Sequence, residues 1–448
     1  MSGIPKATPR LKSVQIAALA MLVAAGVINY IDRATLAVAN PLIREELGLS
    51  IADMGYLLSA FLWAYAFAQL PTGAMVDKIG PRILLALGLS LWSFAQLLGG
   101  LVQGFGQFFG ARLLLGVGEA PQFPTCARVV RDWFNQRDRG LATGIFNCAS
   151  SLGTAIAVPL LTFLMLSFGW RTMFVVMGVA GLVMAAVWYL VYRNPTELAL
   201  TPEENAYRTQ GDPPGQRTKV TFREWKLLFR FRTTWGMIFG YFGCIYLTWI
   251  YTAWLPGYLE IQRHMSVKYT GWAAAIPFAW GVLGGVLGGY IADMLVRRGV
   301  EPLKSRRYPA AIALLGTAAC TVAAAYVESD ALAIAFISAS LFLVYVTSTC
   351  AWALSSVAVP TNCTASIGAV QNFGGYLGGA LAPTVTGLIV QTTGSFVPAL
   401  VVGALIGVVS AASYFFVVDQ PITAMDMDAI SDPGAAVLKA GATKSEIP

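Results

Sequence analysis

The chain contains 448 residues, of which 56% are hydrophobic and 12% are charged. Soluble domains carry about 25% charged residues, and the mean hydropathy here is +0.64. A membrane-spanning helix needs about 20 apolar residues, so twelve of them would use roughly 240 residues. These values exclude a soluble enzyme, a disordered scaffold and a disulfide-rich secreted domain, and they predict a polytopic membrane protein.

The apolar runs form two sets of six. We expect an all-α membrane fold with twelve transmembrane helices in two bundles. The first six spans fall near 15–40, 54–76, 83–102, 106–130, 141–165 and 172–192, and the second six near 234–258, 270–295, 308–327, 331–358, 367–390 and 396–417. The predicted organisation is a cytoplasmic N-terminus 1–14, an N-terminal bundle 15–192, a cytoplasmic linker 193–232, a C-terminal bundle 233–417 and a cytoplasmic tail 418–448.

The distribution of basic residues predicts the orientation. Placing both termini inside the cell assigns 24 of the 30 Lys and Arg residues to cytoplasmic segments, four to the opposite face and two to the spans. This bias follows the positive-inside rule, so the net charge of +7 does not indicate a nucleic-acid partner. No cleavage site closes the first apolar run, which predicts that the first helix stays as an anchor. The six scattered cysteines and the single histidine predict no metal site and no cofactor.

A repeated motif supports the division into halves. The sequence GAMVDKIGPR ends at Arg82 after the second span, and GYIADMLVRRG follows the eighth span, at the equivalent place. In each copy an acidic residue stands about one turn from basic residues, which predicts a charge cluster that breaks and forms as the halves rock. The alternative is an ordinary helix end with interfacial charges. The predicted gating residues are Asp77, Arg82, Asp293 and Arg297.

The motif and its second copy resemble the signature loop of the major facilitator superfamily, over nearly the whole chain. The resemblance implies two pseudo-symmetric six-helix bundles. It also implies that substrate is held between them near the bilayer midplane and that access alternates by rocking.

Four charged residues lie deep in the predicted spans, all in the first half: Asp32, Arg33, Arg112 and Glu119. A charge at the bilayer centre costs about 2.5–3.5 kcal/mol, so it persists where a cavity or a partner stabilises it. Two ion pairs that only join helices are one interpretation. We favour a site, because an anionic substrate would take over the arginines and leave the acids to bind protons. The fourth span around Glu119 also looks loosened, by Gly116, Gly118, Pro121 and Pro124.

These stretches resemble the anion:cation symporter family within that superfamily. The motifs are NYIDRATL around Asp32, RLLLGVGEAPQFP from Arg112, WF with RDRG from Trp133, and NFGGYLG from Asn372. The resemblance implies that Asp32 and Glu119 are the proton-carrying pair. Arg33 is then the ion partner that locks or releases Asp32, and Arg112 lies near the substrate carboxylate. The implied substrate-binding set is Tyr30, Arg33, Tyr65, Arg112, Asn147, Ser150, Tyr241, Trp352 and Asn372.

The sequence departs from the galactonate permeases of that family at several of these positions. Ser150 and Tyr241 stand where those permeases have glutamines, which leaves fewer amides to bind several hydroxyls. Tyr241 and its aromatic neighbours either stack on a sugar face or an aromatic ring, or face lipid.

The predicted function is proton-coupled import of an organic anion, a sugar acid such as a hexuronate or aldonate. The alternative is an aromatic or dicarboxylic acid such as phthalate. Neither a membrane enzyme nor a sensor is expected, since there is no nucleophile–base set and no large signalling domain. The expected partners are the anion, protons and the lipid bilayer. We expect a monomer in a bacterial inner membrane.

Overall fold

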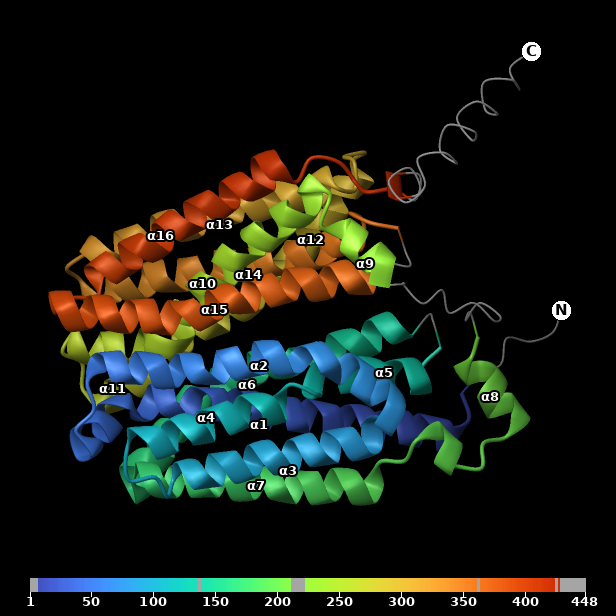
Figure 1. Cartoon of the computed structure of the whole chain (residues 1–448), viewed down its shortest axis with the longest axis horizontal. Helices are drawn as coiled ribbons and strands as arrows, with labels where there is room; N and C mark the ends of the chain where they lie inside the picture. The colour runs from blue at the N-terminus through green and yellow to red at the C-terminus, as the bar shows by residue number, and fades with distance from the viewer. Residues whose placement is uncertain (1–6, 136–137, 211–221, 361–362, 424–425, 428–448) are drawn as a thin grey trace, which may run out of the picture. The chain divides into compact units, whose positions relative to one another are not determined.

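The structure is a computed structural model, and it describes residues 7–135, 138–210, 222–360, 363–423 and 426–427. All regular structure in these ranges is helical (Figure 1), as predicted. The helices are α1 (Pro9–Leu47), α2 (Ile51–Ile79), α3 (Pro81–Gly99), α4 (Phe105–Glu119), α5 (Gln122–Trp133), α6 (Arg139–Phe168), α7 (Trp170–Val191), α8 (Pro202–Arg208), α9 (Phe222–Leu228), α10 (Arg232–Ile261), α11 (Val267–Ala273), α12 (Ala275–Arg297), α13 (Lys304–Tyr326), α14 (Asp330–Ser355), α15 (Thr364–Thr393) and α16 (Val397–Ala412).

Most predicted spans correspond to single long helices. Within the described ranges, ten helical stretches are long and apolar enough to cross a membrane, and Leu152–Phe168 of α6 is a shorter apolar stretch. The predicted fourth span is divided between α4 and α5. The break follows from Pro121 and Pro124, which have no backbone N–H to donate to the helix ladder.

The helices group into two compact units. Unit 1 comprises residues 1–216, 250–279 and 380–398, and unit 2 comprises residues 217–249, 280–379 and 399–448. Parts of α10, α12 and α15 thus belong to each unit, and the bundle boundaries expected from the sequence remain a prediction.

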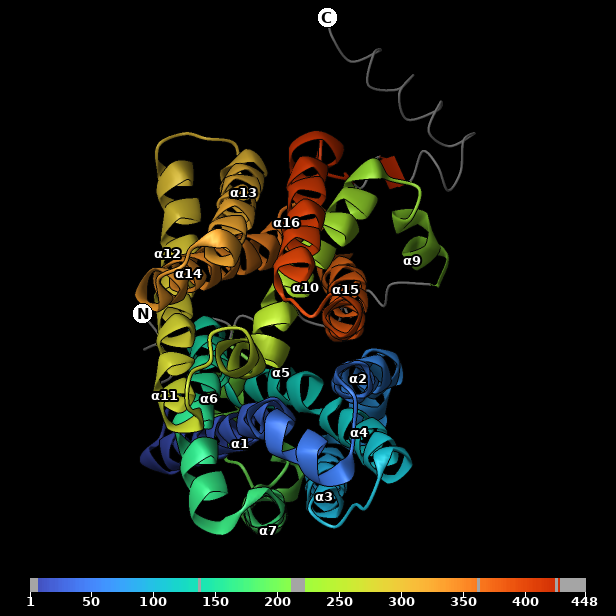
Figure 2. The same cartoon turned by 90° about the vertical axis from the view of Figure 1, so that its left-hand side faces the viewer.

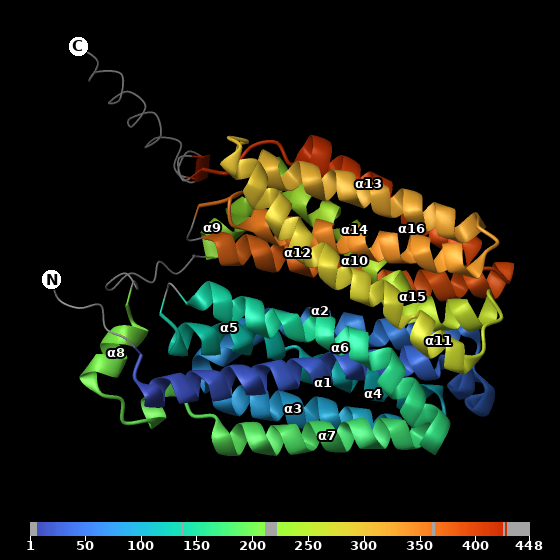
Figure 3. The same cartoon turned by 180° about the vertical axis from the view of Figure 1, so that it is seen from behind.

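Close helix packing organises unit 1. The helices α1 and α6 lie against each other, as do α3 and α7 (Figures 1 and 3). The helix α4 lies between α2 and α3. A Cβ on Gly116 would overlap the carbonyl oxygen of Phe61 in α2, and a Cβ on Gly118 would lie 2.5 Å from the backbone nitrogen of Trp92 in α3. Small residues at these two positions let the three backbones approach.

The first part of the polar linker is docked on unit 1. In α8, Glu204 is only 2% exposed, and its carboxylate accepts a hydrogen bond of 2.6 Å from Thr8, the N-cap residue of α1. Tyr207 donates to Asp138 at 2.6 Å, and Arg208 donates to the backbone carbonyl of Asp132. Figure 3 shows α8 beside the N-terminal end of α1. We call this end of unit 1 the linker end.

At the opposite end of unit 1, the start of α2 crosses α15. The backbone N–H of Thr384 donates to the Ser59 hydroxyl at 3.0 Å, and the two hydroxyls are 2.8 Å apart. Gly55 makes the approach possible, because a Cβ there would lie 2.7 Å from the carbonyl oxygen of Pro383.

In unit 2 the contact between α13 and α14 is polar and uncharged. The helices α13 and α14 lie side by side (Figure 2), and hydroxyls line their contact. The hydroxyl oxygens of Thr321 and Ser340 are 3.0 Å apart, and the Thr347 hydroxyl donates to the backbone carbonyl of Ala310. The chain after α16 returns to this unit, where the buried Arg307 donates to the carbonyls of Val418 and Asp419.

Candidate functional site

The structure brings the four predicted intramembrane charges together in unit 1, from α1 and α4. Asp32 and Glu119 are 0% exposed, Arg112 is 2% and Arg33 is 4%. Arg33 Nε donates to Glu119 Oε2 at 2.7 Å. The charges of Glu119 and Arg112 both act on Asp32. The four side chains therefore form one buried cluster with two acids and two bases.

Arg33 does not pair with Asp32 as the sequence analysis expected. It forms its ion pair with Glu119, and its guanidinium lies over the rings of Tyr30 and Tyr65 at 4.8 and 4.9 Å from the ring centres. Adjacent residues on a helix point about 100° apart. The side chain of Arg33 therefore points toward Glu119, and that of Asp32 leaves α1 in a different direction within the same cluster.

Asp32 and Arg112 keep hydrogen-bonding capacity inside the protein. Neither carboxylate oxygen of Asp32 has a hydrogen-bonding partner among the described residues, and the same holds for Nε and Nη1 of Arg112. Buried polar groups are normally hydrogen-bonded, so each exception requires an explanation. A guanidinium with unengaged N–H groups is suited to donate charge-assisted hydrogen bonds to a carboxylate.

Glycines that the sequence analysis interpreted as loosening α4 have a different role. Gly116 and Gly118 stand where α4 contacts the backbones of α2 and α3, so they tighten the packing of that helix. The discontinuity comes from the prolines. The last residue of α4 is Glu119 itself, and the following residues Ala120 and Pro121 separate it from α5.

Several neighbours of the cluster were not among the predicted site residues. Phe61 of α2 lies under both guanidiniums, at 5.2 Å from Arg33 and 5.4 Å from Arg112. The indole of Trp92 lies close enough to act on Asp32. Gln122 is buried one turn after Glu119. Its i,i+3 spacing from Glu119 is the sequence feature that could have indicated that the two side chains are neighbours.

The other predicted substrate residues lie on several helices. In unit 2, the Tyr241 hydroxyl is 3.4 Å from the Ser348 hydroxyl, and its ring meets Trp352 edge to face at 6.2 Å. Asn372 is half-buried on α15, and Ser150 is half-buried on α6 of unit 1. The side chain of Asn147 is outside the described part of the structure.

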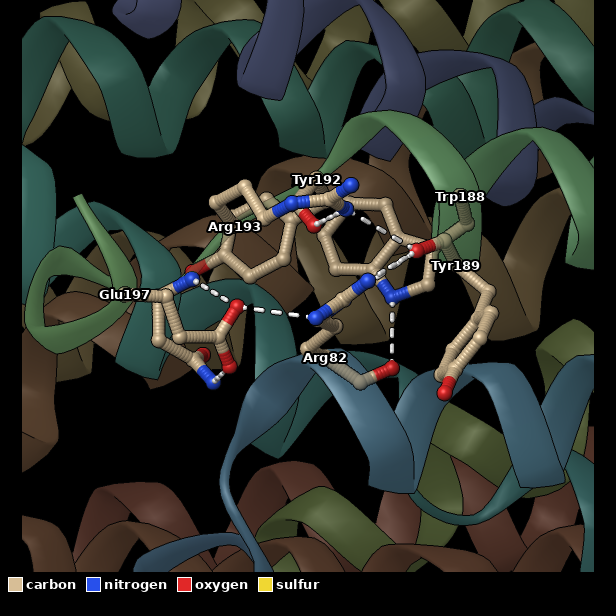
Figure 4. A network of polar contacts seen from close by, with 7 residues as sticks. Arg82, Trp188, Tyr189, Tyr192, Arg193 and Glu197 are labelled. Carbon is tan, nitrogen blue, oxygen red and sulfur yellow. Dashed lines mark hydrogen bonds and ion pairs between the residues drawn. The ribbon is translucent and has the colours of Figure 1, made fainter.

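The predicted gating residues differ in their surroundings. Arg82 donates to the carbonyl of Tyr189 at 2.9 and 3.1 Å and to Glu197 at 3.0 Å (Figure 4). The Trp188 indole in turn donates to the Arg82 carbonyl. Asp293 and Arg297 are exposed on α12, and the side chain of Asp77 is not among those described. Arg82 therefore joins α3 to the end of α7 and to the linker.

Comparison with known proteins decides the family. The model of the Major Facilitator Superfamily matches residues 22–383. The chain belongs to this superfamily. It is a multi-pass membrane transporter and not an enzyme. Among the described residues, no group of three or more His, Cys, Asp or Glu side chains is placed to hold a metal ion.

Curated relatives and solved structures agree with this assignment. The chain is 43% identical to a probable L-galactonate transporter of Escherichia coli (strain K12), over 94% of this chain and 93% of the relative. It is 34% identical to a probable galactarate/D-glucarate transporter of Bacillus subtilis (strain 168), over 87% and 89%. A bacterial homologue of the human lysosomal transporter Spinster has the same fold, with a TM-score of 0.76 at 19% identity, over 92% of this chain and 98% of that one. The names of the two relatives fit the anion:cation symporter family that the sequence motifs indicated.

Proposed function

We propose that this transporter imports an organic anion together with protons, and that the anion is a sugar acid such as an aldonate or a hexuronate. The observation that carries the proposal is the buried guanidinium of Arg112, which has two nitrogens without a hydrogen-bonding partner among the described residues. A substrate carboxylate supplies the missing acceptors. The names of the relatives, which include galactonate and glucarate transporters, support a sugar acid as the class of substrate.

The two acids provide the proton-carrying groups. An ionised carboxylate without a partner is costly to bury, so Asp32 is suited to take up a proton inside the protein. Glu119 is held by Arg33 through one oxygen only, and its Oε1 has no partner among the described side chains and backbone groups. Protonation of Glu119 would weaken the ion pair and release Arg33, which couples the proton to the site.

The orientation follows from the basic residues. We assign the linker end of unit 1 to the cytoplasm of a bacterium, with both termini on that side of the inner membrane, because 24 of the 30 Lys and Arg residues then lie inside. In this orientation Arg82, Asp77, Asp293 and Arg297 belong to cytoplasmic gating segments. We propose that they set the rate of turnover and leave the choice of substrate to the residues within the spans.

Uptake by the purified protein in vesicles tests the function. A panel of radiolabelled aldonates and hexuronates is offered with and without an imposed inward proton gradient. The proposal expects accumulation of a sugar acid above equilibrium only with the gradient. Equal accumulation without it would refute proton coupling, and transport of none of the acids would refute the substrate class.

An aromatic or dicarboxylic acid is the second candidate. The edge-to-face pair of Tyr241 and Trp352 offers an aromatic surface in unit 2, and the relative named for galactarate and glucarate is named for diacids. Adding phthalate and galactarate to the same panel separates the two candidates.

A further inference from the structure

A buried glutamine next to the charge cluster takes no part in the ion pairs described above. Gln122 is the first residue of α5 and is 2% exposed. Its Oε1 has no hydrogen-bonding partner among the described residues, and its Nε2 contacts the Cys126 sulfur at 3.7 Å. A thiol sulfur is a weak acceptor. Within the described structure the amide is therefore almost entirely unsatisfied, in a place where an unsatisfied polar group is costly.

A second unsatisfied amide faces the same acid from α1. Asn29 is 0% exposed and neither its Oδ1 nor its Nδ2 is within hydrogen-bonding geometry of a described group, although it is close enough to act on Glu119. Gln122 stands three residues after Glu119, and the two residues between them keep right-handed helical backbone angles, so the rise between Glu119 and Gln122 is about 4.5 Å. Two hydrogen bonds through one water span about that distance. The unengaged Oε1 of Glu119 and these two amides thus share one buried neighbourhood.

A glycine keeps space open on the α1 side of Gln122. Gly26 lies one turn before Asn29, and a Cβ at Gly26 would be 2.7 Å from the Ala149 Cβ in α6 and 3.8 Å from Gln122 Nε2. Gln122 therefore reaches across to α1 at the level of Gly26. Both steps, from Asn29 to Gly26 and from Glu119 to Gln122, run toward the linker end, where α1 begins and α5 ends.

We propose that the amides of Asn29 and Gln122 hold water against Glu119 and so form the path by which this acid exchanges its proton with the linker end. The inference rests on the proposed proton coupling and assigns its route. In the step, the Glu119 carboxyl loses its proton to the bound water, the water passes one of its own protons on to solvent water at the linker end, and the carboxylate returns to Arg33. The amides neither gain nor lose protons. They are positioning residues.

The test compares two kinds of transport in the same vesicles. Gln122→Met keeps the length and volume of the side chain and removes the amide. We expect substrate counterflow at equal pH to stay at the wild-type rate. The initial rate of uptake driven by a proton gradient should fall by about 100-fold or more, within the range of about 10²–10⁴ that positioned proton transfer contributes. The uptake rate should also become more sensitive to replacement of H2O by D2O, because proton transfer then limits turnover.

Two further variants control for folding and position. Gln122→Asn keeps an amide and should retain most of the proton-driven rate. Gln15→Met removes another buried amide of α1, one that is already bound to the Trp133 carbonyl at 2.7 Å, and should lower stability without changing the isotope effect.

The outcomes separate this inference from the proposed function. If wild-type protein shows no accumulation driven by protons, the coupling itself is wrong. If wild type accumulates substrate and Gln122→Met does so at the same rate, only the water path is refuted. The water path would also be refuted if Gln122→Met and Gln122→Asn each lost counterflow and proton-driven uptake to the same extent. Gln122 would then have a structural role.

Discussion

The two units differ in the polar groups that they bury. Unit 1 buries Asp32, Arg33, Arg112 and Glu119, which come from α1 and α4, and several atoms of Asp32, Arg112 and Glu119 have no partner in the described structure. In unit 2 the buried hydroxyls between α13 and α14 bond to one another and to backbone carbonyls. A satisfied neutral network rigidifies a bundle, and an unsatisfied charged one is available for ligands and protons. We therefore assign charge recognition and coupling to unit 1, and we expect unit 2 to read the shape of the substrate.

The largest effect should come from Arg112→Lys. A lysine keeps the charge but cannot offer the planar fork of a guanidinium. Loss of one charge-assisted hydrogen bond, about 1.5–3 kcal/mol, should weaken substrate binding by roughly 10- to 100-fold in a titration. The matched change in unit 2 is Arg307→Lys, which should loosen the chain after α16 and leave affinity unchanged. Equal affinity of the Arg112→Lys protein would make that residue structural.

Substitutions of Glu119 and Asp32 should separate substrate binding from proton coupling. Glu119→Gln resembles the protonated acid but delivers no proton, so it should exchange substrate across the membrane and fail to accumulate it against a gradient. Asp32→Asn should also lose accumulation. Since Arg33 pairs with Glu119, the asparagine leaves that ion pair intact, and its effect on binding should be milder than that of Glu119→Ala. Measurements of counterflow and of pH-driven uptake in the same vesicles test these expectations. Normal accumulation by Glu119→Gln would show that Glu119 does not carry the coupled proton.

Packing of α4 gives an effect on stability. Gly116→Ala places a methyl group against the Phe61 carbonyl and should lower the free energy of unfolding by about 1–3 kcal/mol. On the same helix, a methyl group added at Gly110 would have no neighbouring atom within 4 Å, so Gly110→Ala should be neutral or stabilising by up to about 1 kcal/mol. Thermal unfolding of both proteins in detergent tests the contrast. Equal melting temperatures would show that α4 is not tightly held.

A smaller effect is expected in unit 2. Tyr241→Phe removes a neutral hydroxyl that lies 3.4 Å from Ser348, and a neutral hydrogen bond contributes about 0.5–1.5 kcal/mol. Affinity for the preferred acid should change by less than in Arg112→Lys, while the ranking of acids that differ in hydroxyl pattern should change. An unaltered ranking would show that the Tyr241 hydroxyl does not contribute to substrate selectivity.

The smallest effect concerns the docking of α8. The Thr8 hydroxyl donates to Glu204 and lowers the pKa of that carboxyl below its usual value. A group with a lowered folded pKa stabilises the folded state above its unfolded pKa, about 4.3, and this contribution is lost as the pH falls through the folded value. The protection factors of the α8 amides, which are corrected for the intrinsic pH dependence of exchange, should therefore fall under acid, and Glu204→Gln should remove this fall. Protection factors that stay constant on acidification of the wild type would contradict the role of this carboxylate.

Sequence patterns predicted the parts that follow from hydrophobicity and covalent constraint. The long apolar runs correspond to helices, and the prolines after Glu119 mark the division between α4 and α5. The predicted partner of Arg33 was wrong, because the direction in which its side chain leaves α1 decides the partner, and adjacent helical residues point about 100° apart. The docked α8 was not anticipated either. Its polar composition is that of a linker, and it is held by specific hydrogen bonds to Thr8, Asp132 and Asp138 that no hydrophobic pattern reports.

The docked linker also determines where the chain tolerates a cut. Residues Asn194 to Arg208 supply partners for Arg82, Thr8 and Asp138 and so belong structurally to the first half. A split transporter made from two co-expressed fragments should therefore assemble when the break follows Gln210. Ending the first fragment at Arg193 would remove these partners from the linker end of unit 1, and a fusion tag inserted after Arg193 would separate them from it.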